Sequence, residues 1–422
     1  MSSCETAPGL NSDECLTIRE RADPRRRPAS RSVHPGFVIF ALAMGGFAIG
    51  TTEFASMSLL PYFAAELAID EPTAGHVISA YALGVVIGAP VIAVLAAKLA
   101  RRTLLIGLMA IFAAANLLSA LSPSYEWMAA FRFLSGLPHG AYFGVAALVA
   151  ASLVPVNRRA QAVAHMMLGL TIATVIGVPA ASWLGQVFGW RWGFALVAVL
   201  ALLTVVLVAL FAPRDKPDAG ASPLRELGAL KRGQVWLTLA IGAIGFGGLF
   251  AVYTYAASTL MDVTRVSPIF VPIVLGLFGV GLTTGNLVTA WAADRALVPT
   301  IGAVLIWSAA SLALYPFAAG NIWAISIVVF LIGCGGGLAT ALQTRLMDVA
   351  EDAQTLAAAL NHSAFNAANA LGPFLGGLAI AAGYGWTSTG WVGCALALGG
   401  LAIFLISQML ERSRRPAASA IP

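Results

Sequence analysis

Two fully charged side chains stand inside long apolar stretches of the sequence. Glu53 lies in the apolar run 36–60 and Arg132 in the run 127–150. A charge at bilayer depth costs at least about 2.5–3.5 kcal/mol, so such a group marks a transport pathway or finds a partner. Burial favours the neutral form of a carboxyl group, whereas a nearby guanidinium favours its charged form. A pair of this kind can therefore take up and release a proton.

The positions of the two groups along their runs place them at similar depths. At 1.5 Å per helical residue, Glu53 lies roughly 10 Å and Arg132 roughly 8 Å from the same membrane face. We therefore expect them to meet or to share a water-filled cavity. One interpretation is a permanent ion pair that joins two helices and never titrates. The other is a proton site at which the charged form of Glu53 is the one compatible with bound substrate.

Neutral polar side chains recur on single faces of other apolar runs. His362, Asn366 and Asn369 follow one another at helical spacing, and His139 shares a face with Arg132. Lipid cannot satisfy such groups, so these faces must look into protein or water. Hydrogen bonding between helices is the alternative to a cavity. The residues expected to line a substrate cavity are His139, Tyr253, Asn286, His362, Asn366 and Asn369.

The composition describes the elements that must position these groups. Of the 422 residues, 59% are hydrophobic and 10% are charged, whereas soluble proteins average roughly 25% charged residues. These values exclude soluble, disordered and disulfide-stapled classes and predict an all-α polytopic membrane protein. The sequence has no phosphate-binding loop, nucleophile elbow or metal-ligand spacing, so we expect no enzyme activity, cofactor or metal. We expect no nucleic acid partner for the arginine-rich segment 19–31, which is interpreted as a topology determinant.

Twelve apolar runs approach the roughly 20 residues that a membrane-crossing helix needs. They lie near 36–60, 76–97, 103–121, 127–150, 163–185, 190–212, 236–260, 268–291, 299–318, 322–343, 355–382 and 386–410.

The distribution of basic residues orients the chain. With the N-terminus inside, all but three of the 24 Lys and Arg residues fall in the inner segments, which predicts cytoplasmic termini. Motifs of the first half recur about 195 residues later, which predicts two parallel six-helix bundles related by an axis along the membrane normal. The expected parts are a basic tail (1–35), a first bundle (36–212), a cytoplasmic connector (213–235), a second bundle (236–411) and a cytoplasmic tail (412–422).

Four local motifs in order resemble one known family. They are Gly50-Thr51-Thr52-Glu53-Phe54, Arg132-Phe133-Leu134-Ser135-Gly136, the stretch from Gly169 through Gly177-Val178-Pro179 to Gly185, and Asn361-His362-Ser363-Ala364-Phe365-Asn366. Together they resemble the major facilitator superfamily, and within it the twelve-span drug:proton antiporters of the arabinose-efflux and chloramphenicol-export type. The resemblance covers residues 36–410.

The resemblance implies roles for further residues. It implies that Arg132 takes part in proton coupling, and that gating or bundle-interface positions are Lys98, Arg101, Arg102, Gly177, Pro179, Asp294, Arg295, Gly372 and Pro373. The sequence departs from the family in the loop between spans two and three. There Ala93 and Ala97 occupy the places of a Gly and an Asp that act in gating.

These observations predict a proton-coupled secondary active transporter that exports a small drug-like or sugar-like solute. We expect it in the bacterial inner membrane as a multi-pass monomer, with the solute, protons and the lipid bilayer as its partners. An importer or facilitator of the same fold is one alternative. A membrane sensor or scaffold without transport is another.

Overall fold

The computed structural model describes residues 34–95, 99–155, 158–214, 231–350 and 354–414, and within these ranges it is helical with no strand. Lys98, the segment 1–33, the segment 215–230 and the segment 415–422 lie outside the described residues.

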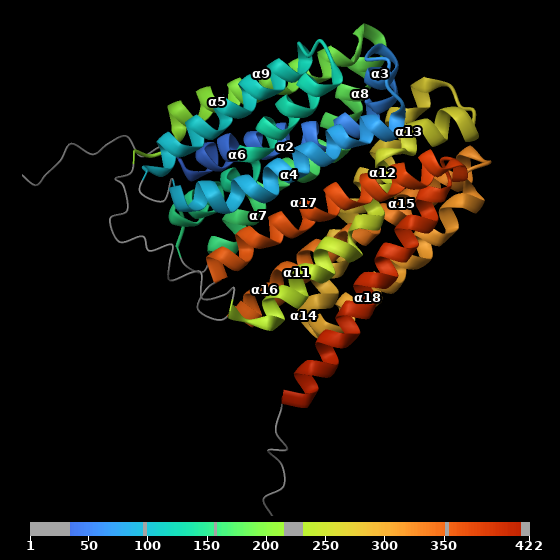
Figure 1. The fold of residues 1–422 in the computed structure, drawn as a ribbon. Helices are drawn as coiled ribbons and strands as arrows, with labels where there is room; N and C mark the ends of the chain where they lie inside the picture. Colours follow the sequence, from blue (N-terminus) through green and yellow to red (C-terminus); the bar gives the residue numbers. More distant parts are fainter. Residues whose placement is uncertain (1–33, 96–98, 156–157, 215–230, 351–353, 415–422) are drawn as a thin grey trace, which may run out of the picture. The chain divides into compact units, whose positions relative to one another are not determined.

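In the first half of the chain, the described residues between 35 and 211 form a series of helices (Figure 1). They are α2 (Pro35–Ser58), α3 (Leu60–Glu66), α4 (Glu71–Leu95), α5 (Arg101–Ala120), α6 (Tyr125–Ser152), α7 (Arg159–Ile172), the π-helical turn η2 (Ala173–Gly177), α8 (Val178–Phe188) and α9 (Trp190–Phe211).

The second half, residues 233–414, repeats this arrangement with more interruptions. Its elements are α11 (Gly233–Gly245), α12 (Gly247–Thr254), α13 (Ala256–Ser258), η4 (Thr259–Val263), η5 (Pro268–Phe270), α14 (Val271–Ala318), α15 (Ile322–Cys334), η6 (Gly335–Gly337), α16 (Leu338–Ala350), α17 (Gln354–Ala379), η7 (Ile380–Tyr384) and α18 (Ser388–Arg414).

Eleven helical stretches of the described residues are long and apolar enough to cross a membrane. One of them, Pro268–Ala318, contains 51 residues, far more than the about 20 that one crossing requires. Its backbone leaves helical geometry at Ala296 (φ −156°, ψ 77°), so the stretch bends there and provides two crossings. The predicted twelve spans of an all-α polytopic membrane protein are confirmed, although the boundary between spans eight and nine is a kink rather than a loop.

The outward faces of the helices are apolar. Side chains such as Leu287, Trp291 and Phe317 are exposed, which in water would leave large apolar patches. Helix α9 is apolar almost all round, as a membrane span is. It starts after Gly189, whose φ of 102° is strained for any residue with a side chain, so the chain turns there between α8 and α9.

The two halves meet along two seams. Helix α17 packs against α4, and α14 packs against η2 and α8. In Figure 1, α3, α8 and α13 gather at one end of these helices, which we call the α3 end. Several contacts between the halves lie towards it, including Tyr62 with Met261 and Gln186 with the Pro268 carbonyl. The charge distribution predicts that the α3 end faces outward.

Candidate functional site

Arg132 is fully buried, with none of its surface exposed. Its Nη1 donates to Thr52 Oγ1 at 2.9 Å and to Ser135 Oγ at 3.5 Å, and its Nη2 donates to Ser56 Oγ at 3.4 Å. The guanidinium also lies 4.2 Å from the centre of the Tyr81 ring, a distance typical of a cation–π contact. Hydroxyl groups and an aromatic face therefore hold this charge on α6 against α2 and α4.

A second step of the same network reaches α5. The Thr52 hydroxyl that accepts from Arg132 donates in turn to Asn116 Oδ1 at 2.7 Å, and Asn116 Nδ2 donates to the Phe112 carbonyl at 2.8 Å. All three polar side chains are buried. Because a hydroxyl has a single hydrogen, the bond to Asn116 fixes the direction in which the Thr52 oxygen faces Arg132.

Glu53 is also buried, with 7% of its surface exposed, but it faces the other half of the molecule. Its Oε1 accepts a hydrogen bond of 3.1 Å from Asn369 Nδ2 on α17. Among the described residues, Arg191 pairs with Glu66 and Arg345 with Glu411, whereas Glu53 forms no ion pair with Arg132. Adjacent helical residues point about 100° apart. Thr52 and Ser56 thus face Arg132, while Glu53 turns towards α17.

Of the two arrangements expected from the sequence, direct contact between Glu53 and Arg132 is absent, and two neighbouring contacts are present instead. Arg132 binds the residues on either side of Glu53 along α2, and Glu53 binds the second half. The permanent ion pair considered from the sequence is absent between these two described residues. The carboxyl group keeps one neutral donor, an amide, as its hydrogen-bond partner.

An aromatic cluster that includes Phe54, the residue after Glu53, joins the two halves. The ring of Phe54 stacks on Phe250 with centroids 6.1 Å apart and meets Tyr253 edge-on at 5.6 Å. Tyr253 in turn lies 4.2 Å from Phe278. These four side chains are buried, so they form an apolar contact between α2 of the first half and α12 and α14 of the second.

The two predicted cavity histidines face each other across the halves. The rings of His139 on α6 and His362 on α17 have centroids 6.4 Å apart. His139 Nδ1 and the Tyr81 hydroxyl form a hydrogen bond of 2.8 Å, and His362 stacks on Phe143 at 5.3 Å. Tyr81 therefore contacts both residues: its hydroxyl is hydrogen-bonded to His139, and its ring lies against the Arg132 guanidinium.

The remaining predicted cavity residues divide into two groups. Asn366 lies on the same face of α17 and donates to the His362 carbonyl at 3.0 Å. Asn286 accepts from Thr340 at 3.1 Å, which joins α14 to α16 within the second half. The structure thus brings Asn366 and Tyr253 near the junction and uses Asn286 to connect two helices of one half.

Several buried polar atoms of these helices have no partner. Such atoms are rare in proteins and point to water or a ligand. Those of the site residues and a neighbouring serine are Arg132 Nε, Tyr253 Oη, Ser363 Oγ, Asn366 Oδ1 and Asn369 Oδ1. Together they provide donors and acceptors for a polar solute or water.

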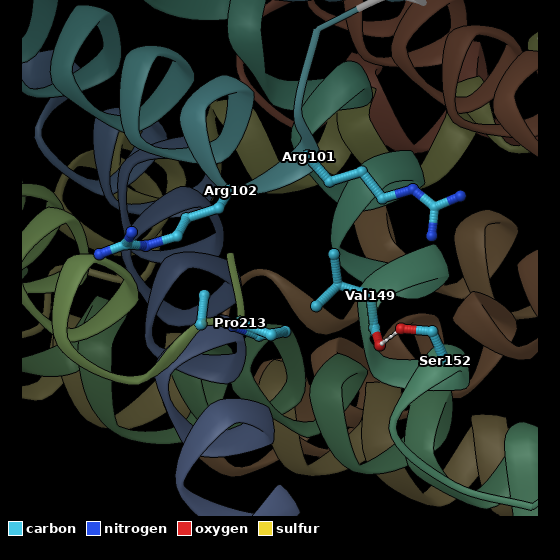
Figure 2. A pocket seen from close by; sticks show the side chains of 6 residues that line it. Arg101, Arg102, Val149, Ser152 and Pro213 are labelled. Carbon is cyan, nitrogen blue, oxygen red and sulfur yellow. Dashed lines mark hydrogen bonds between the residues drawn. The ribbon is translucent and has the colours of Figure 1, made fainter. Parts of the chain in front are cut away.

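Of the predicted gating residues, Arg101 and Arg102 begin α5 and border a pocket. Figure 2 shows their guanidinium groups pointing away from each other on either side of it. Ser152 donates to the Val149 carbonyl at its wall. Arg132 and Ser152 are twenty residues apart on α6, roughly 30 Å, so this pocket is separate from the buried site. Lys98 lies outside the described residues.

The second-half counterparts of these basic residues lie in helix rather than in a loop. Asp294 and Arg295 are exposed and stand immediately before the kink at Ala296. Arg295 donates to the Trp291 carbonyl at 2.6 Å and lies over its ring at 3.9 Å. The predicted spans 268–291 and 299–318 left these two residues in a loop between helices, and this was wrong because the helical backbone continues up to Ala296.

The glycines and prolines predicted as interface positions in spans five and eleven lie on η2, α8 and α17, which are helical elements of the two seams. Gly177 ends the π-helical turn η2, immediately before α8, and a Cβ there would come within 2.2 Å of Thr51 Oγ1. Pro179 is next to Gly276 of α14. A Cβ at Gly372 would come within 2.3 Å of the Gly247 carbonyl oxygen. These glycines allow helices to approach closely.

The Pro373 carbonyl accepts a hydrogen bond from the Tyr255 hydroxyl at 2.9 Å. Both residues belong to the second half, and Tyr255 also lies beside Gly75 of α4. Pro373 thereby fixes a tyrosine at the seam between α4 and α17.

Sequence reasoning missed a second carboxyl group between the halves. Helix α4 begins at Glu71 rather than at residue 76, because Asp70 caps it by accepting from the Thr73 backbone N–H at 2.9 Å. The Glu71 carboxylate accepts from Ser258 of α13 in the second half. Hydrogen bonds from Thr73 also hold the pKa of Asp70 below its ordinary value. A cap signal of Asp followed by Glu-Pro in the sequence could have revealed this start.

Thr52, Ser56 and Tyr81 were missed as partners of Arg132, and Asn116 was missed as the partner of Thr52. Asn116 carried a usable signal, because a lone amide in an apolar run needs a protein partner. The two hydroxyls were recognisable as an i, i+4 pair on α2.

Comparison with known proteins decides the family. A protein-family sequence model described as Major Facilitator Superfamily matches residues 42–295 and 239–421 of this chain. The chain belongs to this superfamily. The inner membrane transport protein YdhP of Escherichia coli (strain K12) is 42% identical over 373 residues, with 88% of this chain and 95% of that protein covered. A chloramphenicol resistance protein of Streptomyces lividans is 34% identical over 345 residues, with 80% and 87% covered.

Solved structures agree on the fold of this superfamily member. The crystal structure of a bacterial homologue of the human lysosomal transporter Spinster has a TM-score of 0.69 at 17% identity, with 92% of this chain and 100% of that chain covered. The predicted family and its fold of twelve helices in two parallel bundles are confirmed. The protein is a multi-pass membrane transporter of small molecules and is not an enzyme.

Proposed function

We propose that the protein exports a small drug-like or sugar-like solute from the bacterial cytoplasm in exchange for protons. The observation that carries this proposal is the buried Glu53 carboxyl group, which contacts the opposite half through Asn369. A carboxyl group at this junction can sense movement of the halves. An acid that exchanges a proton at such a site supplies the coupling that secondary transport requires.

The proposed cycle uses the two halves as rocking units, residues 36–212 and 236–411. Glu53 takes a proton from the outer side, the halves tilt, and the proton leaves to the cytoplasm as solute binds. Arg132 supplies a fixed positive charge beside the carboxyl group, because Thr52 and Ser56 hold it in place. This charge favours release of the proton when the site opens.

The proposed location is the bacterial inner membrane, with both termini in the cytoplasm and the monomer as the working unit. The basic residues of the inner segments support this orientation. The direction of transport is supported by the similarity to a chloramphenicol resistance protein. The predicted gating residues, among them Arg101, Arg102 and Asp294, are proposed to control opening at the end opposite α3.

Two linked experiments test this function. An export-deficient host expressing the protein is challenged with a panel of antibiotics, sugars and nucleosides, and protection identifies a transported compound. Inside-out vesicles then carry a lumenal pH indicator. An exporter that exchanges solute for protons raises the pH of an acidified lumen when that compound is added.

The Glu53→Gln variant should lose this pH change, whereas Glu126→Gln, at the exposed start of α6, should keep it. Acidification of the lumen on solute addition would instead indicate co-transport of solute and protons. A full signal from Glu53→Gln would disprove the proton site.

A further inference from the structure

The bond between Glu53 and Asn369 joins two helices that must move apart during transport. Glu53 belongs to α2 of the first half and Asn369 to α17 of the second, and none of the Asn369 surface is exposed. The amide Nδ2 donates to the carboxyl Oε1 at 3.1 Å. Other contacts between the halves lie nearby, including Ser79 Oγ with the Ala370 carbonyl at 2.8 Å. This bond therefore contributes to closure at the α3 end.

The strength of this bond depends on the state of the carboxyl group. A hydrogen bond to an ionised acceptor is roughly twice as strong as one between neutral groups. Adding a proton to Glu53, or placing a solute donor against its oxygens, weakens or replaces the contact with Asn369. Asn369 Oδ1 has no hydrogen-bond partner, so this oxygen can still accept a hydrogen bond.

We propose that Asn369 is a positioning residue that keeps the empty, proton-free transporter closed at the α3 end. This inference rests on the proposed exchange of solute for protons. An exchanger must prevent the empty carrier from reorienting, because that step would let solute cross without a proton. The hydrogen bond to Asn369 is strongest when Glu53 is ionised and no solute is bound. It therefore opposes reorientation of the empty, proton-free carrier. Protonation or solute binding releases it.

Other titratable groups around Glu53 must be separated from this effect. Arg132 and Tyr81 stand on the side of α6 and α4, and Tyr253 stands on the side of α12. His139 and His362 lie beyond Tyr81, where α6 meets α17.

Glu71 is the other carboxyl group that bridges the halves, through Ser258. Asp262 lies in the turn after α13, and Asp70 is exposed at the start of α4. A variant that removes only the Glu53 charge therefore has to accompany each Asn369 variant.

The test measures closure at the α3 end directly and needs no solute. Spin labels are attached to cysteines introduced at Leu121 and Trp323, both exposed at this end in opposite halves, after the four native cysteines are replaced by serine. Label-to-label distances are recorded in lipid nanodiscs between about pH 4 and pH 8.5, a range that begins near the ordinary pKa of a glutamate. The ratio of open to closed populations is the readout.

In the unsubstituted background we expect this ratio to rise about tenfold as the pH falls, which is the difference between a charged and a neutral hydrogen bond. Asn369→Leu should already be about tenfold more open at high pH and should change little on acidification. Asn369→Ala serves as the second variant if the leucine does not elute as a monodisperse species. Glu53→Gln should be independent of pH.

Ser79→Ala is the matched control. It removes a neighbouring hydrogen bond between the same halves that involves no titratable group, so its pH response should persist. Suppose that both Asn369 variants keep a tenfold pH response while the open-to-closed ratio of Glu53→Gln does not change with pH. This result would overturn the proposed role of Asn369 but not the proposed proton site. A background that ignores pH, or a Glu53→Gln variant that responds like the background, would instead overturn the proposed proton site.

Discussion

Replacement of Thr52 by valine tests whether one hydroxyl holds Arg132 in place. Valine keeps the shape of threonine but leaves Arg132 Nη1 with only the 3.5 Å contact to Ser135, and leaves Asn116 Oδ1 without its 2.7 Å donor. A buried polar group without a partner costs about 1–3 kcal/mol, and more when it is charged. We therefore expect Thr52→Val to lower the free energy of unfolding by about 3–5 kcal/mol.

The matched control is the preceding residue. Thr51 is equally buried, but its hydroxyl donates to the Phe47 carbonyl of its own helix at 2.7 Å. In the valine variant that carbonyl still accepts its helical backbone hydrogen bond. Thr51→Val should cost about 1 kcal/mol or less. Unfolding of the purified protein by sodium dodecyl sulfate in mixed micelles, followed by tryptophan fluorescence, measures both. Equal losses for the two variants would refute the role assigned to the Thr52 hydroxyl.

Two further predictions concern helix packing and helix capping. Gly372→Ala should destabilise the protein by about 1–3 kcal/mol, because its Cβ would meet the Gly247 backbone oxygen; Gly107→Ala, with open space, should cause no loss in the same unfolding assay. Asp70→Ala should cost about 1 kcal/mol at pH 7, since it removes the acceptor of the Thr73 N–H. Because the pKa of Asp70 is held below its ordinary value, this difference should be complete above about pH 4 and shrink as the pH falls further. Thermal unfolding at pH 7 and pH 3 measures it, and an unchanged difference would contradict the capping argument.

The sequence was sufficient to find the helices and the two buried charges. Long apolar runs must be helical in lipid, and a lone charge such as Glu53 or Arg132 is conspicuous within them. The depth comparison also predicted that both groups lie at a similar distance from one membrane face. The sequence did not predict the rotation of α2 about its axis. This rotation turns Thr52 towards Arg132 and Glu53 towards Asn369.

The missed features depend on contacts between distant parts of the chain. Asn369 was predicted as a cavity residue from its helical face, but its partner lies 316 residues away, and no local pattern specifies that pairing. The start of α4 was predicted too late because a charged residue such as Glu71 is typical of a loop. Its partner, Ser258, lies in the other half and is known only from the structure. The uninterrupted helix up to Ala296 was missed because polar residues such as Asp294 usually end an apolar run.

Solute accumulation under an imposed pH gradient tests most directly whether Glu53 carries the proton. Proteoliposomes containing the purified protein receive a gradient of one pH unit, and uptake of the compound identified by the growth panel is followed to its steady state. One buried carboxyl group that exchanges one proton per solute predicts an accumulation of about tenfold, because one pH unit corresponds to about 1.4 kcal/mol. Glu53→Gln should reach a concentration ratio of about one while still exchanging labelled for unlabelled solute. Tenfold accumulation by Glu53→Gln would show that the proton is carried elsewhere.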